Sequence, residues 1–336
     1  MTLTFDKTSL ALAATVLLWA AAFPAIRVAL DGYGPAALSF VRLASASLVL
    51  LAVAPFLGVR RPRRADLPRI LVVGACGMSA YQLLLNWGET RVPAGTASLI
   101  VASVPAISAL LAVAFLGERP TWRTIAGSGI ALAGCGLIAV AGGETGYTAA
   151  AWAVMGAAVV QAVHHFAIKP LLRHRTGLEV ACYAMWAGTV LLLPLAPGAL
   201  GELVRAPAEA TVAAVCLGLL PSAAGFVVWG YAVARLTVTA ATAALYLVPG
   251  VTLVVAYLWL GEAPTPVEAI GGVVTLAGVV LLGRAAPKRR APANRRAAPK
   301  GCDVPEEPCD VPDEPCDVPV DRVTPATGTA SPARPR

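Results

Sequence analysis

The side chains that could do chemistry in this chain lie inside long apolar stretches. Arg42 is a cation placed several residues inside one stretch, and the neighbouring residues His164 and His165 lie inside another. A buried guanidinium can bond to backbone carbonyls or to an anionic ligand, and an imidazole can titrate near neutral pH. Adjacent histidines point about 100° apart on a helix, so we expect at most one to face a cavity, and we select His164.

Aromatic rings and amides supply the remaining binding chemistry. A mostly apolar pocket with a few convergent polar groups is the usual form of a small-molecule site. Asn86, Gln161 and Trp186 belong to the same class of side chain, and each could equally be a core residue. By depth in the apolar stretches, the predicted ligand-binding residues are Trp19, Phe23, Arg42, Tyr81, Gln82, His164, Trp229 and Tyr246.

Pro105 and Pro249 each fall near the middle of an apolar stretch. A proline inside a helix frees the carbonyl four residues earlier, here on Val101 and Leu245. A freed carbonyl at membrane depth survives only against protein or a wet cavity. Ordinary kinks are common as well, but the occurrence of both prolines at one depth favours a hinge or a cavity role.

Carboxylates are missing from the middle of every apolar stretch. This absence disfavours proton exchange on a midplane carboxylate and leaves a strongly cationic ligand without a counter-charge. The stretches also lack paired acids, an H-E-x-x-H motif and a G-x-S-x-G motif, so no catalytic residues are predicted. No phosphate-binding loop occurs, and we predict neither a cofactor nor a metal.

The elements that hold these residues follow from composition. The chain has 336 residues, of which 57% are hydrophobic and 13% charged, which excludes a soluble protein and a nucleic-acid binder. A span needs roughly 20 apolar residues. We predict an all-α membrane protein with ten transmembrane helices near residues 9–30, 35–57, 67–87, 95–116, 123–141, 149–168, 178–196, 210–231, 238–260 and 267–283.

Lys and Arg in the connecting loops predict the orientation, because short cytoplasmic loops retain positive charge. With the N-terminus inside, the outer loops hold only Arg91 and Arg205, while the basic residues at 60–69, 119–123 and 169–175 fall inside. Both termini are therefore predicted to be cytoplasmic, in a multi-pass protein of the inner (plasma) membrane.

The chain also repeats itself. Residues 86–138 align without a gap on residues 230–282, with 15 identities in 53 positions that include Pro105 with Pro249. Each half then has five spans, an odd number, so the second half is inverted relative to the first. Such inverted repeats place a substrate at the midplane and operate by alternating access.

Two smaller features recur in both halves. The sequence LGE-x-P-T is typical of a helix end followed by a helix start, and Glu118 and Glu262 in it are interpreted mainly as hinge or capping residues. Small residues at the spacing of Gly127, Ala131 and Gly134 recur at 271, 275 and 278 and predict close helix packing, without indicating an oligomeric state.

These features together resemble a known family. Trp19 to Phe23, Phe40-Val-Arg42, Asn86-Trp87, Pro105 with LGE, and the repetition of Pro249 with LGE resemble EamA-type members of the drug/metabolite transporter superfamily. The resemblance covers residues 9 to about 284. It implies a carrier of five plus five helices that exports amino acids or other small metabolites, with a cavity lined by the first, third, fourth, sixth, eighth and ninth helices.

We therefore expect a secondary-active exporter of a small molecule in a lipid bilayer, with a possible coupling proton. Its divisions are a first repeat at 1–141, a second at 149–284, and a disordered cytoplasmic tail at 285–336 that is dispensable for transport. An intramembrane enzyme and a non-transporting membrane sensor stay open as alternatives. Substrate identity does not follow from the sequence.

Overall fold

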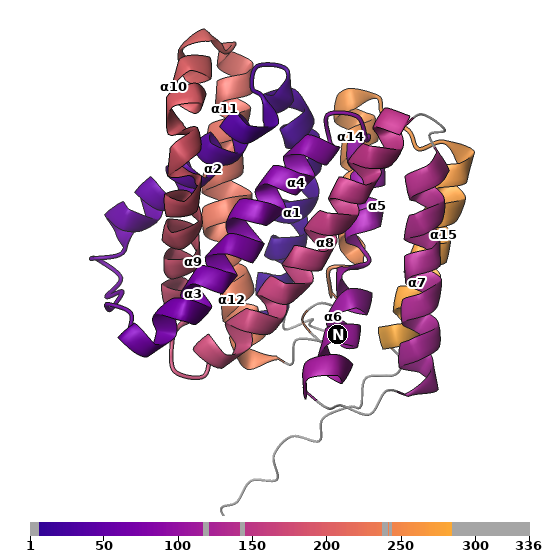
Figure 1. The fold of residues 1–336 in the computed structure, drawn as a ribbon, viewed down its shortest axis with the longest axis horizontal. Coiled ribbons are helices and arrows are strands. Elements are labelled where there is room, and N and C mark those ends of the chain that lie inside the picture. The colour runs from indigo at the N-terminus through magenta and orange to yellow at the C-terminus, as the bar shows by residue number, and fades with distance from the viewer. Residues whose placement is uncertain (1–6, 117–120, 142–144, 237–240, 242–243, 284–336) are drawn as a thin grey trace, which may run out of the picture. The chain divides into compact units, whose positions relative to one another are not determined.

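The computed structural model describes residues 7–116, 121–141, 145–236, 241 and 244–283, and within those ranges every regular element is helical (Figure 1). The predicted tail at 285–336 and Glu118 lie outside the described residues. The all-α prediction is confirmed for the part of the chain that the structure describes.

The helices follow the predicted apolar stretches, with some of those stretches divided into several elements. The first half contains α1 Lys7–Leu30, α2 Pro35–Val53, η1 Arg64–Asp66, α3 Leu67–Gly74, η2 Ala75–Ala80, α4 Tyr81–Gly88, α5 Ala94–Val101, α6 Val104–Leu116 and α7 Trp122–Ala141. The second contains α8 Thr145–Leu171, α9 Gly177–Leu192, η3 Leu193–Leu195, α10 Ala196–Arg205, α11 Ala208–Leu217, η4 Gly218–Ala224, α12 Gly225–Arg235, α14 Leu247–Leu260 and α15 Pro266–Gly283.

Length and composition make these helices suitable for a bilayer. Six helical segments are long and apolar enough to cross a membrane, and four shorter apolar helices accompany them, among the described residues. Large apolar side chains also cover the outside of the bundle, such as Leu17, Phe115 and Leu258 at 60%, 73% and 77% exposure. An exterior of this kind is stable against lipid and costly against water.

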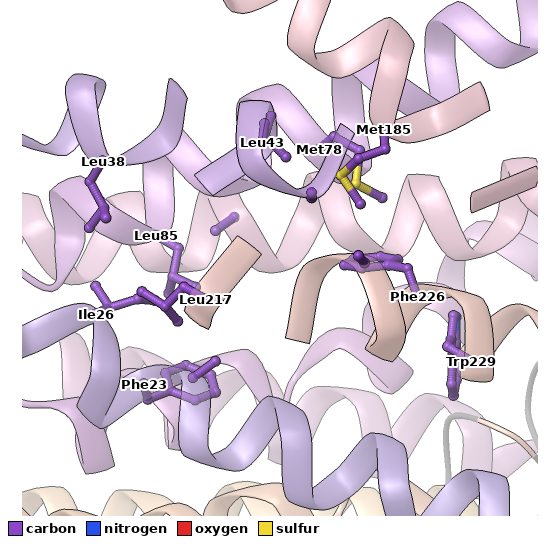
Figure 2. Close-up of a cluster of buried hydrophobic side chains, with 14 of the residues drawn as sticks. Phe23, Ile26, Leu38, Leu43, Met78, Leu85, Met185, Leu217, Phe226 and Trp229 are labelled. Atoms are coloured by element: carbon purple, nitrogen blue, oxygen red, sulfur yellow. The ribbon is translucent and has the colours of Figure 1, made fainter. Parts of the chain in front are cut away.

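The core is built from side chains of nearly all the helices, and its largest fully buried member is Trp229. Figure 2 shows part of it, with Met78 and Met185 close to one another where α9 packs on η2. Phe226 and Trp229 both come from α12 and lie on one side of this view. These contacts hold the inner helices in place around the site described below.

Two of the long helices contain a π-helical segment. Ala75–Ala80 joins α3 to α4, and Gly218–Ala224 joins α11 to α12. Residues 80 and 224, where the two segments end, are separated by the same 144 positions that separate Pro105 from Pro249. A π segment locally widens the helix and turns the residues that follow it, and such segments are frequent at functional sites.

Two other helices are interrupted. The chain leaves helical geometry at Ala102 and Ser103 between α5 and α6, and again at Leu245 and Tyr246 before α14. Each break lies just before one of the two repeated prolines, as expected where a proline removes a helical hydrogen bond. Part of the backbone at each break stays hydrogen-bonded, since the Ser103 N–H donates to the Ile100 carbonyl and the Val248 N–H donates to the Leu245 carbonyl, both at 3.0 Å.

The small-residue stripe predicted on the fifth and tenth spans packs α7 against α15, which lie side by side in Figure 1. A Cβ added at Gly134 would lie 2.5 Å from Thr275 Oγ1, and one added at Gly278 would lie 2.4 Å from the backbone nitrogen of Ala131. The packing interpretation of these residues is confirmed.

Helix ends agree with their local sequence. Gly261 ends α14 with φ of 69°, a left-handed conformation that glycine adopts at no steric cost. Thr265 and Glu268 exchange hydrogen bonds at the start of α15, as in a capping box. Glu262 accepts a hydrogen bond from the backbone N–H of Ala94 at 2.9 Å, so it caps the start of α5 rather than the helix that follows it.

Candidate functional site

A central cavity encloses about 640 Å³ of empty space, part of it open to solvent. Its walls come from α1, α2, α4, α5, α6, α8, α12 and α14. These correspond to the six spans from which the resemblance predicts the lining, together with α2, which contributes Arg42. The walls are mainly apolar, and the polar groups among them are few.

One wall of the cavity is aromatic and centres on Trp19. The ring of Trp19 lies 5.1 Å from that of Phe226 and is stacked on His165 at 6.4 Å, with an angle of 6° between the ring planes. The indole N–H donates to the Pro221 carbonyl at 3.1 Å, so η4 fixes the orientation of Trp19. This wall suits a flat or apolar part of a ligand.

Arg42 places a guanidinium on the cavity wall, the only one among the residues that the structure describes. The residue is 3% exposed, and its Nε donates to the Ser222 hydroxyl in η4 at 2.8 Å. Its Nη1 is buried and has no hydrogen-bond partner. A buried cation with a spare donor is a suitable group for binding a carboxylate.

Gln161 and His165, one helical turn apart on α8, provide the second polar group of the wall. Their side-chain Nε2 atoms lie 3.3 Å apart. The Gln161 Oε1 and His165 Nδ1 atoms are buried and lack partners. The cavity therefore offers a free acceptor as well as a free donor.

Both broken helices also reach the cavity. Val101 and Pro105 line it from the first break, and Leu245 and Pro249 line it from the second. The carbonyl of Val101, which Pro105 frees, therefore belongs to a wall residue, whereas the carbonyl of Leu245 accepts from the Val248 N–H at 3.0 Å. Unwound backbone at a cavity is the arrangement by which many carriers bind polar groups of their substrates.

The structure brings together six of the ten residues selected from sequence. Trp19, Phe23, Arg42, Tyr81, Pro105 and Pro249 all line the cavity, whereas Gln82, His164, Trp229 and Tyr246 are absent from its lining. Gln82 is fully buried with both amide atoms unpartnered, and the other three make the contacts described next.

His164 points away from the cavity and lies 3.1 Å from the Val73 carbonyl through its Nδ1. Trp229 lies behind the aromatic wall, 5.4 Å from Trp19 and 4.9 Å from His165, measured between ring centroids. Tyr246 packs at the second helix break against Ala106 and Ala131.

Among the residues that the structure places at or near the site and that sequence reasoning did not select are His165, Gln161 and Glu89. His165 and Gln161 were both recognised as candidates, and only their orientation was undetermined. Glu89 lies two residues beyond the predicted span at 67–87, where a carboxylate is expected to reach water. A signal existed in its spacing, since Gln82, Asn86 and Glu89 recur at the interval of one helix face.

Glu89 is fully buried just beyond α4, and neither of its carboxylate oxygens has a hydrogen-bond partner. Burial raises the pKa of this carboxyl well above its ordinary value, against the lowering effect of the Arg27 and Arg42 guanidinium groups. The carboxylate of Glu262 acts in the same direction as burial.

An ion pair joins the elements at the end of the bundle where α1 finishes. Arg27 Nε lies 3.2 Å from Glu262 Oε1, and the same guanidinium donates to the Glu89 backbone carbonyl. Because Glu262 also accepts from Ala94, the pair links α1 to the start of α5 and to the turn after α14. We call Arg27, Glu262 and Ala94 the end clamp.

A second network lies at the opposite end. Asp66 accepts from His174 Nε2 at 3.1 Å and from Arg175 Nη2 at 3.4 Å, and Arg175 pairs with Glu179 at 3.5 Å. These contacts join the start of α3 to the connection between α8 and α9. Among the described residues, no group of three or more His, Cys, Asp or Glu side chains is placed to hold a metal ion.

Interrupted helices that meet at a mostly apolar cavity, inside a bundle with an apolar exterior, define a membrane transporter. The model of the EamA-like transporter family matches residues 7–140 and again residues 148–284. This chain belongs to the EamA-like transporter family. It is a multi-pass membrane protein, and it is a transporter rather than an enzyme.

Known relatives agree with this assignment. A protein of Streptantibioticus cattleyicolor named "Probable terminal-alkyne amino-acid exporter" is 61% identical over 289 residues, covering 86% of this chain and 97% of that protein. An uncharacterized transporter of Bacillus subtilis is 36% identical over 263 residues, covering 78% and 86%. A solved crystal structure with 21% identity and a TM-score of 0.59, covering 82% of this chain and 97% of that one, has the same fold.

Proposed function

We propose that this protein is a secondary-active exporter of amino acids with short apolar side chains, terminal-alkyne amino acids included, and that it works by alternating access. One observation carries the proposal. The otherwise aromatic and aliphatic cavity contains a buried guanidinium that has a spare donor, and also an amide that has a spare acceptor. The name of the 61% identical relative supports the same substrate class.

The groups of a zwitterionic amino acid match the cavity. Arg42 would bind the carboxylate through Nη1, while Gln161 Oε1 and the Val101 carbonyl freed by Pro105 would accept from the ammonium group. The aromatic wall around Trp19 would hold the apolar side chain. No carboxylate lines the cavity among the described residues, which disfavours a cationic substrate.

An inverted repeat of five plus five helices would give the motion. The repeat proposed at 1–141 and 149–284 is supported by the two family matches, by the paired π segments and by the paired helix breaks. Six long and four shorter apolar helices would together supply ten crossings. Each half could then rock against the other about the cavity, with Pro105 and Pro249 at the hinges.

The loop charges support an orientation with both termini in the cytoplasm, in the plasma membrane of a bacterial cell. In this orientation the end clamp lies on the outer side and closes it, while the Asp66 network lies on the cytoplasmic side. The driving gradient would be that of the substrate or of protons.

The test is counterflow in liposomes that contain purified protein and are loaded with L-propargylglycine, a terminal-alkyne amino acid. External labelled L-propargylglycine should accumulate inside, and an excess of its carboxamide, which lacks the carboxylate, should compete poorly. Arg42→Gln should lose the preference for the acid over the amide. Arg91→Gln, which removes an exposed loop cation, should keep it.

Two results would contradict the proposal. One is an absence of counterflow for every amino acid tried, and the other is an unchanged acid preference in Arg42→Gln. Product formation from the amino acid in the same vesicles would instead favour an enzyme, and binding without counterflow would favour a sensor.

A further inference from the structure

The buried face of α4 carries a line of polar side chains that leads away from the cavity. Gln82, Asn86 and Glu89 follow one another on this face, and each is 0% exposed. Tyr81, beside Gln82, lines the cavity, whereas Glu89 lies at the end clamp, with its backbone carbonyl bound to Arg27. The line therefore runs from Gln82, which lies next to the lining residue Tyr81 but does not itself line the cavity, to the clamp.

Most polar atoms along this line lack partners. Both amide atoms of Gln82, the Oδ1 of Asn86 and both carboxylate oxygens of Glu89 are buried without hydrogen bonds. Asn86 makes one bond, from its Nδ2 to the Ser39 hydroxyl on α2 at 2.9 Å. Since nine in ten buried polar groups are normally paired, a cluster of unpaired ones indicates a passage that water or a transported proton uses.

Charged groups surround Glu89 from every side. Arg27 faces it from α1, Arg42 from α2 and Glu262 from the turn after α14, and the Tyr81 hydroxyl on α4 also lies within electrostatic range. Neither guanidinium bonds to the Glu89 carboxylate. Arg27 pairs with Glu262, and Arg42 bonds to Ser222 through Nε while its Nη1 stays unpartnered. An ionised Glu89 would thus be buried without a donor, which is unfavourable in a low-dielectric interior.

We propose that Glu89 is the proton-binding residue of this transporter, and that the outer end closes only when Glu89 carries a proton. The inference rests on the proposed export function. With the clamp closed, the neutral acid needs no cationic partner. When the clamp opens, water reaches the carboxyl, and Glu89 exchanges its proton directly with the outer solution, while Asn86 and Gln82 lead from it toward the cavity.

The consequence is a return step that consumes an external proton. After the substrate leaves Arg42 on the outer side, the empty carrier closes again only once Glu89 is protonated. The proton then leaves along the line toward the cavity when the cavity opens to the cytoplasm, and the ionised Glu89 that remains destabilises the closed clamp, so the outer end opens again in the next cycle. Net export of substrate therefore moves protons inward, whereas one-for-one substrate exchange does not require them.

The experiment compares proton movement with exchange in one preparation. Liposomes with wild-type protein, loaded with the pH dye pyranine, should change internal pH when an L-propargylglycine gradient is imposed. Glu89→Gln, which is permanently neutral, should retain counterflow of L-propargylglycine and lose at least tenfold in proton movement. Glu202→Gln is the matched control, because this half-buried carboxylate lies at the same end and already bonds to the Gly34 N–H.

A second measurement needs no variant. Dicyclohexylcarbodiimide reacts with protonated carboxyls in apolar surroundings, so peptide mapping of the treated wild-type protein should place an adduct on Glu89, with less adduct as the pH rises. Full proton movement in Glu89→Gln, or no adduct on Glu89 at acid pH, would overturn the inference. Wild-type counterflow without proton movement would overturn the inference about Glu89 and leave the export proposal standing. Absence of wild-type counterflow would count against the export proposal itself.

Discussion

Replacing Gly278 by Ala should weaken the packing of α7 on α15, because the added methyl group meets backbone rather than a movable side chain. The new Cβ would lie 2.4 Å from the Ala131 nitrogen and 2.6 Å from the Gly127 carbonyl oxygen. Ordinary contacts of a Cβ begin at 3.4 Å, so the helices must separate by about 1 Å. A gap of that size forfeits roughly a quarter to a half of each dispersion contact that spans it.

The expected cost is about 1–3 kcal/mol of stability, the range measured for added methylene groups in well-packed cores. Thermal denaturation of the detergent-solubilised protein, followed by size-exclusion chromatography of heated samples, measures this effect. Gly136→Ala is the matched control on α7, since its Cβ would meet nothing within 4 Å. Equal denaturation midpoints for Gly278→Ala and Gly136→Ala would refute the packing argument.

Two further predictions concern the site and the clamp. Ser222→Ala removes the acceptor for Arg42 Nε at 2.8 Å. Loss of this charged hydrogen bond, worth about 1.5–3 kcal/mol, should raise the half-saturating L-propargylglycine concentration about tenfold or more. An unchanged concentration would show that Arg42 does not need this support. Glu262→Gln weakens a part-exposed ion pair of about 0.2–1 kcal/mol and should favour outer opening by a factor of about five at most. Faster labelling of Ala22→Cys in the cavity by an external, impermeant maleimide would report that opening, and an unaltered rate would contradict it.

The elements were predictable because helix formation in a bilayer depends on local composition. A run of about 20 apolar residues must satisfy its own backbone hydrogen bonds, so the run itself specifies a helix. Pro105 and Pro249 could be placed at helix breaks by the same local logic. The glycine stripes were predictable from repetition, since close packing needs small residues at fixed spacing on both partners.

Which side chains face the cavity was less predictable, because tertiary contacts decide the rotation of each helix. His164 and His165 are equivalent by depth, but a Cβ added at Gly77 would lie 1.9 Å from His164 Nδ1. The missing side chain of Gly77 therefore makes the slot that receives His164 and turns His165 to the cavity. Trp229 follows the π segment of η4, and the local change of helical pitch rotates it behind the wall.

Glu89 shows why the depth of a residue within a predicted span is an insufficient criterion for a functional carboxylate. By sequence it lies past the end of a span, where a charge would normally reach water. In the structure, α1, the start of α5 and the turn after α14 meet above it through the end clamp and leave it fully buried. The sequence does lack a midplane carboxylate, but this absence does not exclude a titratable one. Because the clamp over Glu89 opens and closes, the state of the carrier decides whether this carboxylate is buried or reaches water. Proton coupling requires a titratable group whose exposure changes in this way.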